Sequence, residues 1–464
     1  MSYGEGKPQI PQHESKCYRV RHSIQPAKKA DDSEGQGASE RPALGRGGCR
    51  MTVPPGTRGP GRVSHFRFPI SVFPFLFALV LGFGWSATPH AQSNAAPQAT
   101  HAAMRFAFGG NAAHIPVEFL HNLIFVPTRV NDSKTSLFEL DTTVRASSID
   151  PGRLMELGLT LERPPVLDFP GVEVPLAALP AIAKKDFAAN VGRPYQGTLG
   201  GDLFCCAVME ISYWRQTLLL YDPGVYKYSG KGASLPLTFH EGVPVVHAKF
   251  ALPEGKIREA DFAVDTTLDA SIVFSGQSGG KHGRFSSHMH TVPFNDLQLN
   301  GGEVVAMGRL KGFQLGPYWV VNPIVEFSQA KVAAASESNA AGVIGGGLLR
   351  RFTVIFDFPH QRMIVDANLH IREDEQEDKS GLTIVAGGPG LKRLEVVRVQ
   401  PGTPGSDAKI QKGDVIEGVD DEAVADMTLD SLRDIFRQPA GQHKLLMSRN
   451  GQTVQVTIKL RQLI

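Results

Sequence analysis

Two aspartates stand in nearly identical settings in this 464-residue chain. Asp141 lies in Leu140-Asp141-Thr142-Thr143, and Asp265 lies in Val264-Asp265-Thr266-Thr267. Each follows an apolar, strand-like run and begins a tight loop. A carboxylate at the end of a buried strand is costly unless something uses it, so the recurrence predicts a duplicated unit whose two acids meet. Two such acids share one proton and can act together as general acid and general base.

A second pair of segments supports the duplication. Residues 197–204 (GTLGGDLF) align without gaps on residues 342–349 (GVIGGGLL), and the register continues until 217–220 aligns on 362–365. A repeat this long indicates two lobes rather than a solenoid. We expect a mainly β fold, with lobe 1 over 105–225 and lobe 2 over 234–371.

These motifs resemble the aspartic proteases, and in particular the bacterial retropepsin-like group, over roughly residues 115–370. The resemblance implies two pseudo-symmetric β lobes around a cleft, with Asp141 and Asp265 as the catalytic pair and no cofactor. It also implies that Thr142 and Thr266 bond across the lobes and support the pair. A flap over the cleft is expected within residues 163–196.

The third loop position differs from the family's usual Asp-Thr-Gly, because Thr143 and Thr267 stand where the family has glycine. With ordinary backbone angles a threonine fits there, and its hydroxyl can bond the aspartate. With positive φ it would be strained by about 1–3 kcal/mol. An active peptidase and an inactive fold therefore both remain open, with Thr143 and Thr267 as further dyad-supporting residues.

The last eighty-odd residues form a separate small α+β domain. A strand from Leu382, a helix with one apolar face over 429–436 and a hairpin turn at Asn450-Gly451 resemble a bacterial PDZ domain over 380–464. The resemblance places peptide binding at the strand edge and beside the helix, at these residues: Gly381, Leu382, Thr383, Ile384 and Leu432. Because the carboxylate-binding loop is matched only in part, strand addition is favoured over capture of a free C-terminus.

The N-terminal region predicts export. Residues 1–50 are polar and without periodicity, which indicates a disordered extension. Residues 51–91 show three arginines, an apolar run and a small-residue exit, as in a signal peptide, so we expect a periplasmic or secreted protein. Membrane contact is expected only through an uncleaved signal segment. Residues 1–91 hold 12 Lys/Arg and 6 Asp/Glu; the whole chain is +2, so the remainder is −4 and nucleic-acid binding is disfavoured.

The remaining signals have a structural interpretation beside each functional one. Cys205 and Cys206 are expected on an apolar strand, buried and unable to form an ordinary disulfide. His282, His288 and His290 could bind metal or line a polar loop, and we predict no metal site. Two segments are expected at the surface: a loop over 333–341 and a charged linker over 372–379. Asp202, Asp269 and Asp357 are interpreted as structural or weak candidates.

Three hypotheses follow. The first is an exported aspartic endopeptidase that cleaves protein or peptide substrates with a water held between the two acids, and whose PDZ domain binds a peptide ligand. The second is an inactive scaffold that binds peptides in the same cleft and PDZ domain. The third is a processing enzyme with one narrow target. Inhibitor-sensitive cleavage separates the enzymes from the scaffold.

Overall fold

The computed structural model describes residues 104–159, 164–183, 187–276, 289–299, 301–439 and 441–464. The expected extension (1–50) and signal segment (51–91) lie outside these residues. Strands dominate the described chain, and the predicted fold class is confirmed: two related β lobes precede a small α+β domain. In the part of the chain that the structure describes, none of the helices combines the length and apolarity needed to cross a membrane.

Lobe 1 is built on a sheet in the order β1-β8-β7-β4-β5-β9-β6, with β3 beside β4. Its centre is a parallel pair, β5 with β9, followed by an antiparallel pair, β9 with β6. The order along the chain is β1 (Arg105–Phe106), β3 (Glu118–Leu120), β4 (Leu123–Val130), β5 (Ser136–Leu140), β6 (Ser148–Ile149), α1 (Pro151–Glu156), β7 (Val166–Phe169), β8 (Val172–Pro175), α2 (Phe187–Val191), β9 (Gly197–Leu199) and α3 (Gly201–Phe204).

Lobe 2 has the same central arrangement of one parallel and one antiparallel strand pair. Its β15 runs parallel to β22, and β22 is antiparallel to β16, in a sheet ordered β17-β18-β21-β16-β22-β15-β14-β19-β20 with β13 beside β14. The elements are β13 (Thr238–His240), β14 (Val243–Ala251), β15 (Ile257–Val264), β16 (Ile272–Phe274), β17 (Thr291–Asp296), β18 (Glu303–Arg309), β19 (Gly312–Leu315), β20 (Tyr318–Val321), β21 (Ile324–Phe327), α5 (Ala333–Glu337), β22 (Gly342–Ile344) and α6 (Gly346–Leu349).

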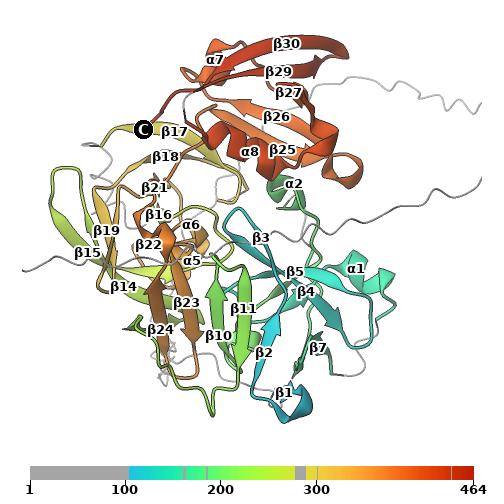
Figure 1. The fold of residues 1–464 in the computed structure, drawn as a ribbon, viewed down its shortest axis with the longest axis vertical. Helices are drawn as coiled ribbons and strands as arrows, with labels where there is room; N and C mark the ends of the chain where they lie inside the picture. Colours follow the sequence, from blue (N-terminus) through green and yellow to red (C-terminus); the bar gives the residue numbers. More distant parts are fainter. Residues whose placement is uncertain (1–103, 160–163, 184–186, 277–288, 300, 440) are drawn as a thin grey trace, which may run out of the picture. The chain divides into compact units, whose positions relative to one another are not determined.

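A third sheet takes strands from both lobes, in the order β12-β24-β23-β10-β11-β2. Its middle pair, β10 with β23, is antiparallel and joins the lobes edge to edge, so these two strands lie side by side in Figure 1. The strands are β2 (Ala112–Ile115), β10 (Val208–Ser212), β11 (Thr217–Tyr221), β12 (Ala233–Pro236), β23 (Phe352–Asp357) and β24 (Arg362–Ala367). One hydrophobic core runs beneath both lobes, which makes them a single folding unit.

The repeat seen in the sequence is also structural. At a constant offset, β9, α3, β10 and β11 of lobe 1 correspond to β22, α6, β23 and β24 of lobe 2. The prediction of a surface loop over 333–341 is wrong. Residues 333–337 form α5, and Ala334, Ala335, Ala340 and Ala341 are buried against lobe 2. Alanine is small and a strong helix former, so the low-complexity run can pack closely.

The C-terminal domain has its own core and a sheet ordered β25-β26-β27-β29-β30, with β28 beside β27. Asn450 and Gly451 have φ of 52° and 80°, as the predicted hairpin turn requires. The elements are β25 (Leu382–Gly387), β26 (Arg393–Val399), α7 (Pro404–Asp407), β27 (Val415–Val419), β28 (Glu422–Ala423), α8 (Leu429–Arg437), β29 (Gln442–Arg449) and β30 (Gln452–Lys459).

The charged segment 372–379 is not a solvated linker. Glu377 is buried and ion-paired with Arg309 at 2.6 Å. Glu375 accepts a hydrogen bond from Ser271 at 2.7 Å, and Lys379 is also buried. The second half of the segment is therefore packed and paired, whereas residues 372–374 and 376 are exposed.

Candidate active site

Asp141 and Asp265 occupy equivalent positions at the ends of β5 and β15. The amide of Asp141 donates to the carbonyl of Leu199, and the amide of Asp265 donates to the carbonyl of Ile344, both at 2.9 Å. The last residues of β9 and β22 therefore hold the first residue of each loop. Both lobes present their aspartate from the same local geometry.

Thr142 and Thr266 connect the two loops. The hydroxyl of Thr142 donates to the carbonyl of Val264 at 2.7 Å and accepts from the amide of Thr266 at 3.2 Å. The hydroxyl of Thr266 donates to the carbonyl of Leu140 at 2.6 Å and accepts from the amide of Thr142 at 3.2 Å. Both side chains are fully buried. This reciprocal set crosses between the lobes and brings the two aspartate loops together.

Thr143 and Thr267 each bond their own lobe's aspartate. In each loop the threonine amide donates to the aspartate Oδ1 at 2.8 Å, and the threonine hydroxyl donates to the same oxygen at 2.7 Å. Neither threonine is among the residues with positive φ. The backbone is therefore ordinary at the third position, so threonine fits without strain and supplies a donor that glycine lacks.

The carboxyl groups of Asp141 and Asp265 interact electrostatically. Burial, followed by the charge of Asp141, raises the pKa of Asp265 from its ordinary 3.8 to about 7, against the lowering effect of the two bonds from Thr267. Asp141 is itself buried, with 7% of its surface exposed. The site thus favours a single proton held on Asp265 near neutral pH, as expected of two close carboxyls.

This shift predicts a pH-dependent stability. Between pH 3.8 and about 7 the folded protein holds a proton on Asp265 that the unfolded chain releases. The free energy of unfolding should therefore fall as the pH rises through this window. Urea unfolding at pH 5 and pH 8 measures the fall, and Asp265→Asn should make it smaller. An equal fall in wild type and variant would contradict the shift.

The hydroxyl of Thr267 provides a second test. Because its bond lowers the pKa of Asp265, Thr267→Gly should raise that pKa further, by roughly 0.5–1 pH unit for one hydrogen bond. Thr267→Ser keeps the hydroxyl and is the matched control. NMR titration of protein carrying 13C-labelled aspartate measures both variants. If the titration curve of Asp265 in Thr267→Gly coincides with that in wild type, the hydroxyl of Thr267 does not affect the pKa of Asp265, and only the backbone amide does.

Sequence reasoning missed two residues beside Asp141. Glu139 is buried in β5, and its carboxyl lies near enough to Tyr195 to affect the pKa of that hydroxyl. Burial, then the charges of Glu139 and Asp141, raise the pKa of Tyr195 well above its ordinary value. Two features of the sequence could have indicated Glu139. Residues 139 and 141 are two apart, so they lie on the same face of a strand, and Glu139 is an acidic residue within an apolar run.

The other acids of the sequence analysis are distributed as follows. Asp202 accepts from the amide and the hydroxyl of Ser147, at 2.8 and 2.5 Å. Asp357 is fully buried and pairs with Arg362 and His360, each at 2.6 Å. Both are therefore structural. Asp269, set aside as a weak candidate, lies four residues after Asp265 and bonds lobe 1.

The prediction that Cys205 and Cys206 lie on a strand is wrong. They follow α3 in a turn, and their sulfurs lie 4.0 Å apart instead of on opposite faces. Both thiols approach the carbonyl of Asp202. Neither is disulfide-bonded, and Cys205 is buried as expected. The tight turn after the glycine pair of lobe 1 is what brings the two thiols together.

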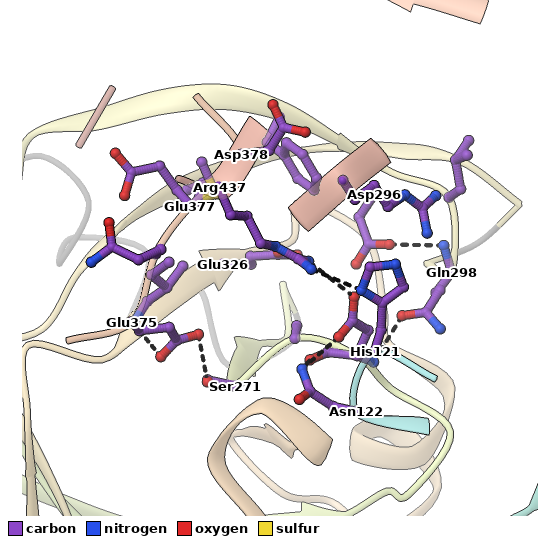
Figure 2. Close-up of a pocket in the computed structure, with 18 of the residues that line it drawn as sticks. His121, Asn122, Ser271, Asp296, Gln298, Glu326, Glu375, Glu377, Asp378 and Arg437 are labelled. Carbon is purple, nitrogen blue, oxygen red and sulfur yellow. Dashed lines mark hydrogen bonds and ion pairs between the residues drawn. The ribbon is translucent and has the colours of Figure 1, made fainter. Parts of the chain in front are cut away.

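The predicted peptide groove of the C-terminal domain is present as a strand edge beside a helix. Among the described strands, β25 stands at one end of its sheet, and α8 packs beside it. Leu382, Thr383 and Ile384 line a cavity of about 580 Å³, whereas Leu432 is fully buried in the domain core. Figure 2 shows this cavity, whose wall includes part of the Asp265 loop but neither Asp141 nor Asp265.

The loop before β25 already uses its own polar groups. Gly381 has a φ of 69°, and the Ser380 amide donates to Asp378 at 2.7 Å. The Leu382 amide donates to the Ser380 hydroxyl at 3.1 Å. Burial raises the pKa of Asp378, despite its bonds from Ser380. A carboxylate and a hydroxyl of the chain thus satisfy donors that a bound C-terminus would need, which favours strand addition.

The residues that come closest to a metal-ligand set are His121, Asp430 and Asp434. The Nδ1 atom of His121 faces the guanidinium of Arg437 at 2.8 Å, and its Nε2 lies 2.6 Å from Asp430. The guanidinium can only donate, so the ring proton stands on Nε2, and a second cation beside Arg437 does not fit. Of the predicted histidine loop, His290 bonds the Leu463 carbonyl, while His282 and His288 lie outside the described residues.

A model of the PDZ domain family matches residues 395–449, which cover β26 to β29 and α8. The chain carries a PDZ domain at its C-terminus. The predicted C-terminal PDZ domain is thereby confirmed, and its bounds of 380–464 stay a prediction. No curated protein matches the chain.

Three solved structures show partial likeness. The photosystem II D1 C-terminal processing protease matches 18% of this chain and 23% of its own, with 29% identity and a TM-score of 0.17. A retropepsin-like aspartic protease from Rickettsia conorii matches 30% of this chain and 96% of its own chain, with 18% identity and a TM-score of 0.22. Basic 7S globulin from soybean matches 56% and 96%, with 11% identity and a TM-score of 0.36. Likenesses this limited carry no argument about activity, which therefore depends on the site.

Proposed function

We propose that this protein is an aspartic endopeptidase that cleaves protein or peptide substrates between its two lobes. The observation that carries the proposal is the reciprocal bonding of the buried Thr142 and Thr266, which brings the two aspartate loops together. The raised pKa of Asp265, due to burial and to Asp141, supports a shared proton. A proton-sharing carboxyl pair can activate a water and so hydrolyse a peptide without a covalent intermediate.

The proposed mechanism uses each carboxyl in one role. The ionised member of the pair takes a proton from a water as the water oxygen attacks the peptide carbonyl carbon. The protonated member, Asp265, donates to the carbonyl oxygen and stabilises the charge that develops there. Collapse of the tetrahedral intermediate breaks the C–N bond, and a proton passes from the dyad to the leaving amine. The Thr143 and Thr267 bonds fix the oxygens that are not reacting.

The PDZ domain has the role of binding a peptide, either a segment of the substrate or a separate partner. Strand addition to β25 would require α2, which packs against this strand, to move away. The rival function is a scaffold that holds peptides in the same cleft and PDZ groove without cleaving them. The absence of strain at Thr143 and Thr267 favours the enzyme, because the departure from glycine leaves the dyad bonds intact.

The test is cleavage of an unfolded protein by the full chain. Reduced and alkylated casein is incubated at pH 3 to 8, with and without a statine-type inhibitor, and the products are identified by mass spectrometry. New peptide termini that disappear with the inhibitor support the endopeptidase. Binding of the casein without cleavage at any pH supports the scaffold, and one cut site in many tested proteins supports a processing enzyme.

Export is proposed on the basis of the segment 51–91 alone. Expression of the full chain in a bacterium, followed by separation of periplasm from cytoplasm, tests it. N-terminal sequencing of the recovered protein should place the first residue near Ala91. A cytoplasmic protein that retains residues 51–91 would refute the proposal without affecting the peptidase.

A further inference from the structure

The loop that carries Asp265, residues 265–271, is held as one rigid piece. Three consecutive glycine amides donate to its carbonyls: Gly345 to Ser271, Gly346 to Leu268 and Gly347 to Asp269. A Cβ at position 345 would lie 2.2 Å from the carbonyl oxygen of Ala270, so only glycine allows this approach. Displacement at the far end of this loop is therefore transmitted to its beginning.

Gln298 connects the far end of the loop to the dyad. Its Oε1 accepts from the amide of Asp269 at 2.8 Å, and its Nε2 donates to the carbonyl of Thr267 at 3.1 Å. Thr267 in turn bonds Asp265 through both its amide and its hydroxyl. Asp269 is thus coupled to Asp265 by a short, continuous set of hydrogen bonds.

The turn between β3 and β4 holds Asp269 from lobe 1. The Nδ2 atom of Asn122 donates to Asp269 Oδ1 at 2.6 Å and to its carbonyl at 3.0 Å. The neighbouring His121 is nearly fully buried, with 2% of its side chain exposed, and it faces the PDZ helix. In Figure 2 both residues project into the cavity from the turn, toward the end of Arg437.

Helix α8 of the PDZ domain completes this junction. Arg437, its last residue, lies 3.5 Å from Asp269 Oδ2 and donates to His121 Nδ1 at 2.8 Å. Asp430, in its first turn, lies 2.6 Å from His121 Nε2. Burial acts to raise the pKa of Asp269, but the charges of Arg437 and Arg433 and the hydrogen bond from Asn122 outweigh it, and the pKa stays below its ordinary value. The carboxylate is therefore ionised and paired with α8.

Lobe 1 also fixes the position of α8. The guanidinium of Arg433 donates to the carbonyl of Asn190 in α2 at 2.8 Å. Gly192, with a φ of 79°, lies directly against α8. A Cβ at this position would lie 2.8 Å from the Cβ of Leu429. Helix α2 packs against β25 as well. The PDZ helix is thus held on two sides, and it is not a free appendage.

We propose that Arg437 is a positioning residue for the peptidase: through Asp269 it fixes the loop that presents Asp265, so the PDZ helix contributes to turnover and not only to substrate binding. This rests on the proposed function. Asp269 has no counterpart in the lobe 1 loop, where Arg145 stands four residues after Asp141. Of the two aspartate loops, the one in lobe 2 therefore carries the acidic residue that pairs with the PDZ helix.

The test compares four variants of the full chain: Arg437→Gln, Arg437→Lys, Asp269→Asn and the double variant Arg437→Gln/Asp269→Asn. We expect Arg437→Gln to lower kcat about tenfold with KM within about twofold, because small displacements of a catalytic group are expensive in rate. The double variant should be no slower than the slower single variant, since both break one contact. Arg437→Lys, which keeps the charge, should recover part of the rate.

Arg449→Gln is the matched control. Arg449 pairs with buried Asp414 at 2.7 Å inside the PDZ domain, and neither of its described partners lies in a lobe. This variant should destabilise the PDZ domain and leave kcat unchanged. An equal loss of kcat in Arg449→Gln and Arg437→Gln would mean that general loosening of the PDZ domain is responsible, and would overturn the proposal.

Amide hydrogen exchange of residues 265–271 gives a readout that does not need activity. Arg437→Gln should exchange faster than wild type in this segment. If wild type cleaves, and Arg437→Gln changes neither kcat nor exchange, the positioning role is overturned while the peptidase stands. If wild type does not cleave casein, the peptidase fails and so does any catalytic role of Arg437; the exchange result then decides only whether Arg437 orders the loop.

Discussion

Asp141→Asn and Asp265→Asn are each expected to lower kcat for peptide hydrolysis by about 10³–10⁴-fold, near the upper end for loss of a general acid or base. Asparagine keeps the shape of the side chain but can neither accept the proton of the attacking water nor be ionised. The double variant should lose little more than either single variant, because the two groups act as a unit. Steady-state cleavage of a fluorogenic peptide derived from a casein cut site measures kcat.

Asp168→Asn is the control for this prediction. Asp168 lies in β7, where it pairs with Arg129 on the lobe surface, away from both loops. Its replacement should leave kcat within about twofold of wild type. A rate in either dyad variant within tenfold of wild type would show that the carboxyl pair does not perform the chemistry, even if the protein cleaves casein.

Thr142→Val and Thr266→Val are expected to lower the free energy of unfolding by about 2–5 kcal/mol each. Valine matches the shape of threonine, but each replacement leaves a buried amide and a buried carbonyl of the opposite loop without a partner. An unsatisfied buried polar group costs about 1–3 kcal/mol. Urea unfolding at pH 5 measures the change, and kcat should fall as well, because the dyad loses the bonds that align it.

Serine at either position distinguishes the contribution of the hydroxyl group from that of the packed methyl group. Thr142→Ser and Thr266→Ser keep every hydrogen bond of the set and lose only one methyl group, so each should cost about 1 kcal/mol and retain most of the activity. A larger loss of stability in the serine variants than in the valine variants would indicate that the methyl groups, and not the bonds across the lobes, stabilise this junction.

The central architecture could be predicted because duplication repeats the same pattern in one sequence. The two Asp-Thr-Thr loops and the two glycine-containing segments fix which strands end together, and the structure places β5 beside β9 and β15 beside β22 accordingly. The PDZ domain was likewise recognisable from its helix face and from the Asn450-Gly451 turn. In each case a local rule of backbone geometry specifies the element.

The junction around Asp269 could not be predicted, because its side-chain partners Asn122 and Arg437 come from two distant segments. Asn122 and Arg437 lie 147 and 168 positions from Asp269, and no periodicity links them. The packing of the second half of residues 372–379 was missed for the same reason, since a run of charges resembles a solvated segment until Arg309 and Arg351 are known to face it. The Cys205-Cys206 turn was missed because apolar neighbours suggested a strand.

The pairing of β10 with β23 has a consequence for assembly. A peptidase whose two halves are separate chains loses its dyad on dilution, because each half then dissociates from the other. Here the halves share one sheet within one polypeptide, so they meet at an effective concentration set by the connecting segment. Specific activity should therefore stay constant from micromolar to picomolar protein. Because the two halves are encoded in one chain, each can also acquire substitutions that the other does not share.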